Sequence, residues 1–368
     1  MELTVDIIDL DHNGRGIGKI NNKVIFIPNA LPGEKVKVKI LKDKKNYAEG
    51  VLLELINKSN TRIGSPCKYY PKCGGCQLLH LKYEDQLIYK ENKIKNIFKK
   101  YNLEEVKINN IVYKNKQFNY RNKVTLHRQN NKIGYFEENT NTIVEIDNCM
   151  LLDKKINDSL KNVPSNNKIV IRSNGIDISH NNSEKVMHTI VDYKFSVSND
   201  SFFQVNDNVT ELLYSKVLEY LEPTKNDTVL DLYCGTGTIG IFISNHVKNV
   251  IGIELNKVAI KNAKENKELN KINNIEFICG DAGLESKKLI IPPDSIIVDP
   301  PRSGLDSEAI NTILNLNPKK IVYVSCDPMT LIRDLKVLSE NYNIIELTPF
   351  DMFPNTYHVE CVCNLVLK

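Results

Sequence analysis

The sequence predicts an α/β protein in which a small β-barrel and a central α+β segment precede a doubly wound parallel sheet. Strand-like and helix-like segments alternate from Thr228 to Leu338, which is the pattern of a parallel sheet with crossover helices. Residues 1–56 instead show short runs with period-2 alternation, which is typical of a small barrel. Three apolar strands of the sheet end in a glycine loop, an acid and a cysteine, at the edge where open α/β sheets hold their ligands.

Length and composition indicate a globular protein of two or three domains. The chain has 368 residues, of which 41% are hydrophobic. No apolar run approaches the roughly 18 residues of a membrane span, and the amino terminus lacks a charged-then-apolar leader. We therefore expect a cytoplasmic protein. In that compartment, nine cysteines are expected to be metal ligands, nucleophiles or core residues rather than disulfides.

Charge is distributed unevenly along the chain. Residues 1–130 carry 25 Lys and Arg against 13 Asp and Glu, a net +12, which leaves −8 for the remainder of a chain whose total is +4. A basic amino-terminal third attached to a mildly acidic body suggests a polyanion-binding module joined to a catalytic one. The alternative is that the lysines only solubilise a surface.

The barrel is expected from five short apolar runs. They are Leu3–Val5, Ile7–Ile8, Lys23–Ile27, Glu34–Ile40 and Gly50–Leu53. The alternation of Lys35, Lys37 and Lys39 predicts three cations on one strand face. The glycines of Gly14–Gly18, followed by Pro28 and Leu31–Glu34, resemble the TRAM domain, an oligonucleotide-binding-like barrel that accompanies RNA-modifying enzymes. A barrel without a role in RNA binding is the alternative.

Four cysteines have the spacing of metal ligands. Cys67, Cys73 and Cys76 lie close together, and Cys149 follows some seventy residues later. A four-thiolate site needs ligands from a tight loop and from another segment, and glycines between Cys73 and Cys76 let the backbone fold around it. Spacing alone does not distinguish zinc from an iron–sulfur cluster. The alternative is a set of unrelated buried cysteines.

The central segment, residues 58–195, offers weaker signals. Helical periodicity runs from Tyr83 to Tyr101, with its lysines expected mainly on solvated faces and phosphate contact as the alternative. Residues 118–128 and 132–136 predict a strand pair. Its cations, Arg121, Lys123 and Arg128, interleave with Tyr120, Tyr135 and Phe136. Such a surface can stack on single-stranded RNA, although ordinary half-buried sheets look similar.

The carboxyl-terminal domain is predicted element by element. A helix over 208–221 comes first, and two strands near 344–347 and 358–367 come last. Strands are expected at 228–232, 249–253, 275–279, 295–298 and 320–324. Helices are expected at 239–245, 257–269, 307–316 and 329–338.

Acids at three successive strand ends indicate a bound nucleoside. Gly235–Gly240 reads G-x-G-x-x-G, and Glu254 ends the next strand, which alone is a weak dinucleotide signal. Asp281 and Asp299 follow the third and fourth strands. Ribose contact by Glu254 and adenine contact by Asp281 would match the arrangement of S-adenosylmethionine methyltransferases, which have a Rossmann-like fold. The alternative is that each acid is a helix cap or turn residue.

The chain closely resembles the family of RNA uracil-5 methyltransferases. The resemblance rests on the TRAM-like barrel, the four spaced cysteines, Ser201–Asn206, Asp231–Gly240, Asp299–Arg302, Ser325–Pro328 and Phe353–Glu360. It implies a [4Fe-4S] cluster on Cys67, Cys73, Cys76 and Cys149. It also implies cofactor contacts from Gln204, Tyr233, Gly235, Gly237, Thr238, Glu254, Asp281 and Asp299. Thr238 stands where relatives often carry Asn.

The resemblance further implies a nucleophile, Cys326, and a proton acceptor, Glu360. A thiolate that adds to carbon 6 of uracil gives carbon 5 the carbanion character it needs to attack a methyl group. A base must then remove the proton on carbon 5 so that the cysteine is released. We expect nearby helix amino-termini to lower the thiol pKa, and Asp299 or Gln204 to hold the pyrimidine edge. The target base must be flipped into the pocket.

Other interpretations leave more unexplained. Amino-group methyltransferases use Asp-Pro-Pro before an aromatic residue, whereas Arg302 follows here. A nicotinamide oxidoreductase or a non-catalytic RNA-binding protein leaves Cys326 and Glu360 without a role. We expect 23S ribosomal RNA as the substrate, with the T-loop uridine of transfer RNA as the alternative. The predicted domains are 1–57 (TRAM-like), 58–195 (central) and 196–368 (methyltransferase), in a monomer with no protein partner implied.

Overall fold

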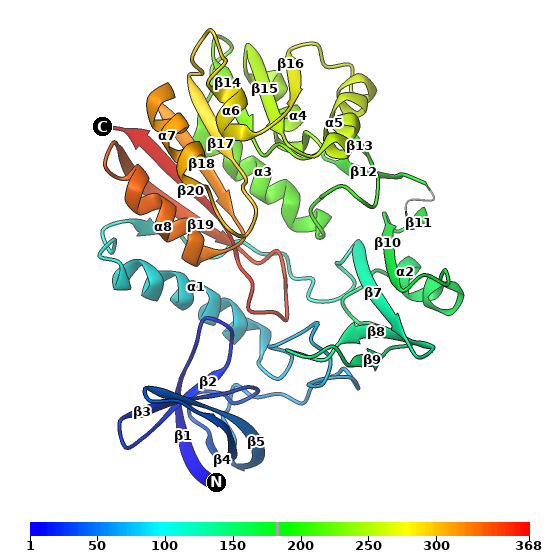
Figure 1. Cartoon of the computed structure of the whole chain (residues 1–368), viewed down its shortest axis with the longest axis vertical. Helices are drawn as coiled ribbons and strands as arrows, with labels where there is room; N and C mark the ends of the chain where they lie inside the picture. The colour runs from blue at the N-terminus through cyan, green and yellow to red at the C-terminus, as the bar shows by residue number, and fades with distance from the viewer. Residues whose placement is uncertain (182–183) are drawn as a thin grey trace. The chain divides into compact units, whose positions relative to one another are not determined.

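The computed structural model describes residues 1–181 and 184–368, which form two compact units. One unit consists of Met1–Lys93, Leu126–Cys149 and Phe353–His358, and the other of Ile94–Thr125, Met150–Met352 and Val359–Lys368. The chain therefore passes between the units several times (Figure 1). The three-domain division expected from the sequence stays a prediction.

A closed five-stranded barrel, in the order β1-β2-β3-β5-β4, begins the first unit. Its strands are β1 (Glu2–Leu10), β2 (Gly16–Ile20), β3 (Lys23–Ile27), β4 (Lys35–Asp43) and β5 (Tyr47–Asn57). In β4, Val36 and Val38 point into the core, so Lys35 and Lys39 lie exposed on the other face, as the alternation predicts. The predicted barrel is confirmed.

The first unit also contains the start of helix α1 (Tyr83–Lys100) and the strands β8 (Lys132–Phe136) and β9 (Ile143–Glu145). Helix α1 holds the loop Phe353–His358. The Nζ of Lys90 donates to the carbonyl of Phe353 at 3.0 Å, and Gln86 accepts the N–H of Asn355 at 3.0 Å. Lys90 is 0% exposed, so the expectation of a solvated lysine is wrong at this position, because a backbone carbonyl from the distant loop satisfies it.

The second unit is built on an eight-stranded sheet in the order β16-β15-β14-β17-β18-β20-β19-β6. Its strands are β6 (Lys107–Ile108), β14 (Thr228–Leu232), β15 (Asn249–Glu254), β16 (Ile275–Cys279), β17 (Ser295–Val298), β18 (Lys320–Ser325), β19 (Tyr342–Phe350) and β20 (Glu360–Leu367). The first five strands in this order are parallel, and β20 pairs antiparallel with both β18 and β19. The predicted doubly wound sheet is confirmed.

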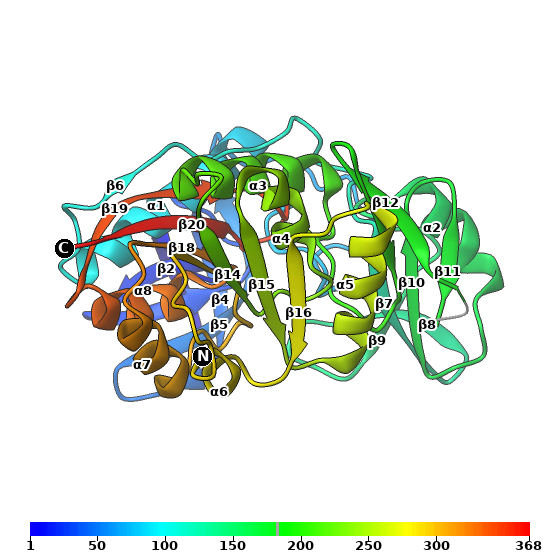
Figure 2. The same ribbon diagram turned by 90° about the horizontal axis from the view of Figure 1, so that it is seen from above.

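Helices cover both faces of this sheet (Figure 2). Helices α3 (Asp207–Leu221), α4 (Thr238–Ile243) and α5 (Lys257–Leu269) lie on one side. Helices α6 (Ala282–Ser286), α7 (Ser307–Leu316) and α8 (Pro328–Leu338) lie on the other. The remaining elements of this unit are α2 (Lys154–Ser159), β10 (Lys168–Ser173), β11 (Ile178–His180), β12 (Val186–Ile190) and β13 (Tyr193–Val197).

Most predicted boundaries agree with the structure, and the differences have local causes. The strand expected from residue 118 begins only at Lys123 as β7 (Lys123–Gln129), because Asn119 adopts a left-handed conformation with φ 53°. The last strand begins at Glu360 rather than His358, because the preceding residues belong to the loop held by α1. No described helix is long and apolar enough to cross a membrane.

Candidate active site

A glycine loop joins β14 to α4 and forms one wall of a pocket. Gly235 and Gly237 have φ values of +55° and +77°, a region that side chains strongly disfavour. A Cβ on Gly237 would collide with the ring of Phe277, whereas one on Gly235 would meet nothing within 4 Å. The backbone at Gly235 is therefore open to a ligand.

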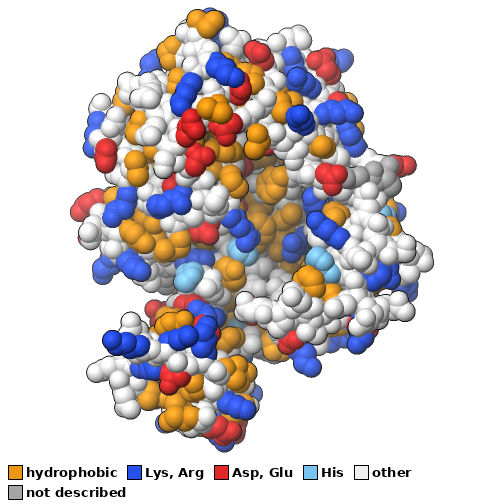
Figure 3. Space-filling view, viewed as in Figure 1, with side chains coloured by type: hydrophobic (Ala, Val, Ile, Leu, Met, Phe, Trp, Pro, Cys, Tyr) orange, Lys and Arg blue, Asp and Glu red, His pale blue; other side chains and the backbone are white. Residues whose placement is uncertain are grey.

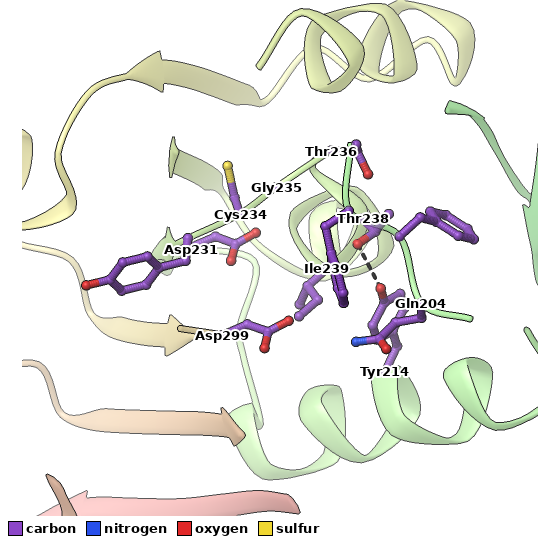
Figure 4. A pocket seen from close by; sticks show the side chains of 12 residues that line it. Gln204, Tyr214, Asp231, Cys234, Gly235, Thr236, Thr238, Ile239 and Asp299 are labelled. Carbon is purple, nitrogen blue, oxygen red and sulfur yellow. Dashed lines mark hydrogen bonds between the residues drawn. The ribbon is translucent and has the colours of Figure 1, made fainter. Parts of the chain in front are cut away.

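The pocket gathers predicted cofactor residues with others that the sequence did not reveal (Figure 4). Its lining comprises Phe202, Phe203, Gln204, Tyr214, Asp231, Tyr233, Cys234, Gly235, Thr236, Thr238, Ile239 and Asp299. The side chains of Gln204 and Asp299 point toward one another from opposite sides. The hydroxyl of Tyr214 donates to Oγ1 of Thr238 at 2.7 Å. Thr238 therefore has a defined orientation in the pocket.

Two buried polar atoms of this lining have no hydrogen-bond partner among the described residues. They are Oδ1 of Asp231 and Oγ1 of Thr236, which are 0% and 2% exposed as residues. Buried polar atoms are normally satisfied, so these atoms indicate a missing polar ligand. A nucleoside cofactor such as S-adenosylmethionine fits this chemistry.

Three predicted cofactor residues lie outside the lining. Glu254 ends β15, and its carboxylate accepts the N–H of Gly235 at 3.2 Å and that of Asn256 at 2.8 Å. Gly237 caps α4 at its amino terminus. Asp281 caps α6 by accepting the N–H of Leu284 at 3.0 Å, so the helix-cap alternative describes its contact in the structure. Glu254 remains next to the glycine loop.

Cys326 and Glu360 come together at the ends of two paired strands. Ser325 pairs with Cys361 across β18 and β20, so the next position in this register sets Cys326 beside Glu360. Glu360 is 2% exposed and Cys326 is half-buried. Asp299, at the end of the neighbouring strand β17, interacts electrostatically with both. The sequence-predicted nucleophile, base and uracil-positioning acid thus share one edge of the sheet.

The electrostatics of this edge favour protonated groups. Burial, followed by the charges of Glu360 and Asp299, raises the pKa of the Cys326 thiol to about 12. Burial also raises the pKa of Glu360 well above its usual value, and that of Asp299 to about 7. Burial and the charge of Asp299 raise the pKa of Asp231 to about 8.

The pKa of the Cys326 thiol is therefore raised, whereas nearby helix amino-termini were expected to lower it. Helix α8 does begin beside Cys326, but Asp327 caps it. The Asp327 carboxylate accepts the N–H groups of Met329 and Thr330 at 2.8 and 3.4 Å. The helix end thus satisfies a carboxylate rather than a thiolate.

Some functional candidates were missed at the sequence level. Asp231 could have been identified from the sequence, because a carboxylate inside an otherwise apolar strand is costly to bury and so indicates a special role. The sequence offers no feature that would identify Tyr214 or Thr236, since a tyrosine in a helix and a threonine in a loop are common in any protein. Their position in the pocket depends on contacts between distant segments.

The four spaced cysteines lie in the first unit and form no disulfide. Two segments carry them, and Asp147 ties these together by accepting hydrogen bonds from Lys68 at 2.7 Å and Tyr69 at 2.5 Å. However, across residues 1–181 and 184–368 no three His, Cys, Asp or Glu side chains form a group that could hold a metal ion. The expected iron–sulfur cluster is therefore not supported by the side-chain geometry.

Comparison with known proteins gives consistent matches. Residues 164–287 and 290–368 match the family tRNA (uracil-5-)-methyltransferase, and residues 1–53 match the TRAM domain. An uncharacterized RNA methyltransferase of Staphylococcus aureus (strain MRSA252) is 37% identical, over 99% of this chain and 98% of the relative. One of Clostridium acetobutylicum is 38% identical, over 98% and 95%.

A solved structure agrees over the whole chain. The Pyrococcus abyssi tRNA (uracil-54, C5)-methyltransferase, in complex with S-adenosyl-L-homocysteine, superposes with a TM-score of 0.78 and 27% identity. The match covers 99% of this chain and 100% of that chain. It therefore extends over both compact units.

Proposed function

The chain belongs to the tRNA (uracil-5-)-methyltransferase family and is an S-adenosylmethionine-dependent RNA methyltransferase, and on this premise we propose that it methylates carbon 5 of a uridine in 23S ribosomal RNA. One observation carries the assignment of chemistry: Cys326 and Glu360 adjoin at the ends of β18 and β20, next to Asp299 of the cofactor pocket. A thiol, a base and a bound methyl donor are what this reaction requires.

The proposed reaction begins at the Sγ of Cys326. Once its proton has passed to solvent, the thiolate adds to carbon 6 of the uracil and makes carbon 5 nucleophilic. S-adenosylmethionine, when bound, would supply the methyl group as a sulfonium electrophile, and its sulfur would leave as the thioether S-adenosylhomocysteine. Asp299 holds the pyrimidine edge, and as a carboxyl with a pKa near 7 it is able to donate as well as accept a hydrogen bond.

Glu360 completes the cycle. Once Glu360 has released its own proton to solvent, its carboxylate takes the proton from carbon 5, the bond between Sγ and carbon 6 breaks, and the thiolate is regenerated. Its raised pKa makes it a stronger base than an exposed glutamate. Gln204, Tyr233, Gly235, Gly237, Thr238, Glu254, Asp281 and Asp299 are the proposed cofactor contacts.

The amino-terminal barrel is the proposed RNA-binding module, within the domain boundaries 1–57, 58–195 and 196–368. Figure 3 shows Lys and Arg side chains on it beside acidic and hydrophobic ones. Lys35 and Lys39 are exposed on β4, where cations are able to contact phosphates. We propose that the protein acts on RNA as a cytoplasmic monomer.

The choice of RNA has two candidates. Family members that combine a TRAM domain with the four-cysteine set typically act on ribosomal RNA, which favours 23S rRNA. The Pyrococcus abyssi enzyme acts on uridine 54 of tRNA, which favours the T-loop. The test is transfer of tritiated methyl groups onto unmodified 23S rRNA and unmodified tRNA side by side. Label as 5-methyluridine only in tRNA would overturn the ribosomal choice and keep the chemistry, whereas no 5-methyluridine in either would overturn both.

The [4Fe-4S] cluster remains a separate proposal, on Cys67, Cys73, Cys76 and Cys149. The spacing of the four cysteines and their place in one unit support it, and no step of the reaction depends on it. Anaerobically purified protein should contain about four irons and four sulfides per chain. One zinc instead would keep the ligands and exclude the cluster.

A further inference from the structure

Three asparagines at four-residue intervals form a ladder between α5 and the edge strand β13. Each side-chain oxygen accepts a backbone N–H, and the pairs are Asn262 with Ser198 at 3.3 Å, Asn266 with Ser196 at 2.7 Å, and Asn270 with Lys194 at 2.9 Å. Four helical residues rise about 6 Å and two strand residues about 6.6 Å, so the two spacings match. Figure 1 shows α5 lying beside β13.

The three rungs differ in what their amide nitrogens reach. The Nδ2 of Asn270 returns to the same strand and donates to the carbonyl of Lys194 at 2.7 Å. The Nδ2 of Asn266 instead donates to the carbonyl of Thr236 in the glycine loop at 3.2 Å. The Nδ2 of Asn270 also donates to the carbonyl of Asn266 at 2.7 Å. The outer rung therefore joins the strand to the end of the helix, whereas the middle rung connects the strand to the pocket.

The inner rung supports the opposite wall of the pocket. The Nδ2 of Asn262 lies 3.1 Å from Oγ of Ser201, the residue before the lining segment Phe202–Gln204. The carbonyl of Ser201 accepts further hydrogen bonds from Arg172 at 3.0 Å and Lys123 at 3.3 Å. This wall is thus held by buried polar groups rather than by apolar packing alone.

The hydrogen bonds of Asn262 and Asn266 are buried, so their loss is costly. Asn266 is 0% exposed, and Asn262 is 1% exposed, so water does not replace a lost partner. Thr236, whose carbonyl Asn266 binds, carries the buried hydroxyl that lacks a partner and faces the pocket. The middle rung of the ladder therefore binds the residue whose unpaired hydroxyl indicates a ligand in the pocket.

We propose that Asn266 is a positioning residue for S-adenosylmethionine. By bridging the N–H of Ser196 and the carbonyl of Thr236, it fixes the glycine loop relative to the segment that leads to Gln204, before the cofactor arrives. Preorganised walls spare the ligand the cost of ordering them. The inference rests on the cofactor binding of the proposed function, but not on the identity of the RNA.

Asn270 provides a matched control, because it is the same residue type at the carboxyl-terminal cap of the same helix and makes the same kind of strand contact. Calorimetric titration with S-adenosylhomocysteine should give an Asn266→Ala variant a Kd about tenfold above wild type. Asn270→Ala should stay within about twofold. With saturating cofactor, Asn266→Ala should retain kcat while its KM for S-adenosylmethionine rises.

Asn266→Asp guards against a variant that does not fold. It preserves the side-chain volume and the acceptor for Ser196, and at alkaline pH it replaces the donor to Thr236 with a carboxylate oxygen. Its Kd should rise as for Asn266→Ala. An unchanged Kd in either folded variant, or an equal rise in Asn270→Ala, would overturn the proposal. Wild type that binds S-adenosylhomocysteine but methylates no RNA would refute the proposed function and leave this test intact.

Discussion

The thiol of Cys326 and the carboxyl of Glu360 lie side by side at adjoining ends of β18 and β20, and the charge of Glu360 acts more strongly on the thiol than that of any other residue. The proposed base therefore opposes ionisation of the proposed nucleophile. Arg302 is the cation that favours the thiolate, and its effect is smaller than that of either Glu360 or Asp299. The balance of these charges and of burial favours the protonated thiol.

The first prediction concerns thiol reactivity. Because the pKa of Cys326 is raised to about 12, alkylation of this residue by iodoacetamide should increase about tenfold per pH unit from pH 7 to 10 without a plateau. Peptide mass spectrometry should follow each cysteine, with exposed Cys279 as the internal reference. A plateau for Cys326 near pH 8 would contradict the raised pKa.

The second prediction concerns the nucleophile. Cys326→Ala should lower methyl transfer by at least about 10⁴-fold, because the ring then has no route to activation at carbon 5. Affinity for S-adenosylhomocysteine should change by less than about twofold, since Cys326 is not among the lining residues of the pocket. Cys279→Ala, at a cysteine outside the proposed reaction, serves as the control. Turnover retained in Cys326→Ala would remove this residue from the mechanism.

The third prediction concerns the base. Glu360→Gln should permit methyl transfer but block proton removal, so a covalent complex between protein and RNA should accumulate. Denaturing gels with labelled RNA should reveal a band that disappears in the Cys326→Ala, Glu360→Gln double variant. Normal turnover by Glu360→Gln would mean that another group removes the proton.

The fourth prediction follows from two raised carboxyl pKa values. The pKa values of Asp299 and Asp231 lie near 7 and 8 in the folded protein, against about 3.9 in an unfolded chain. The native state therefore binds more protons, and this contribution to stability is lost as the pH rises through 7 to 8. The Tm of the cofactor-free protein should fall by a few degrees between pH 6 and pH 9. Asp231→Asn should reduce that dependence, and an unchanged slope would contradict the assignment.

The fifth prediction concerns the clamp on the loop Phe353–His358. Lys90→Met should destabilise the protein by about 1–3 kcal/mol, because the fully buried Lys90 side chain no longer donates to the carbonyl of Phe353, which keeps only the N–H and hydroxyl of Thr356 as donors. Lys99→Met, at an exposed position of the same helix, should change the unfolding free energy by less than about 0.5 kcal/mol. Urea denaturation measures both. Equal effects would show that the lysine charge, and not the buried contact, matters.

The sequence was sufficient where local pattern decides structure. The bounds of β14, α5, β16, β17 and α7 were predicted to the residue, because apolar strands and capped helices alternate there without interruption. The edge occupied by Cys326 and Asp299 followed from the rule that strand ends hold the site, whereas Glu360 was implied only by the resemblance to the family.

The remaining features depend on partners far away in the chain. Lys90 is buried by a carbonyl more than 260 positions later, and Asn266 bridges two backbone groups that periodicity does not relate to it. The raised pKa of the Cys326 thiol likewise arises from burial and from carboxyl groups brought near it by the fold. From the sequence, a lowered thiol pKa was expected instead. Composition and spacing contain no signal for such contacts.

Strand β20 links two parts of the second unit. It lies between β18 and β19, so β19 and β6 join the sheet only through it, although β19 precedes it in the chain. Glu360, the proposed base, is the first residue of this strand. A change that detaches β20 would therefore remove the proposed base from Cys326 and separate β19 and β6 from the rest of the sheet at the same time.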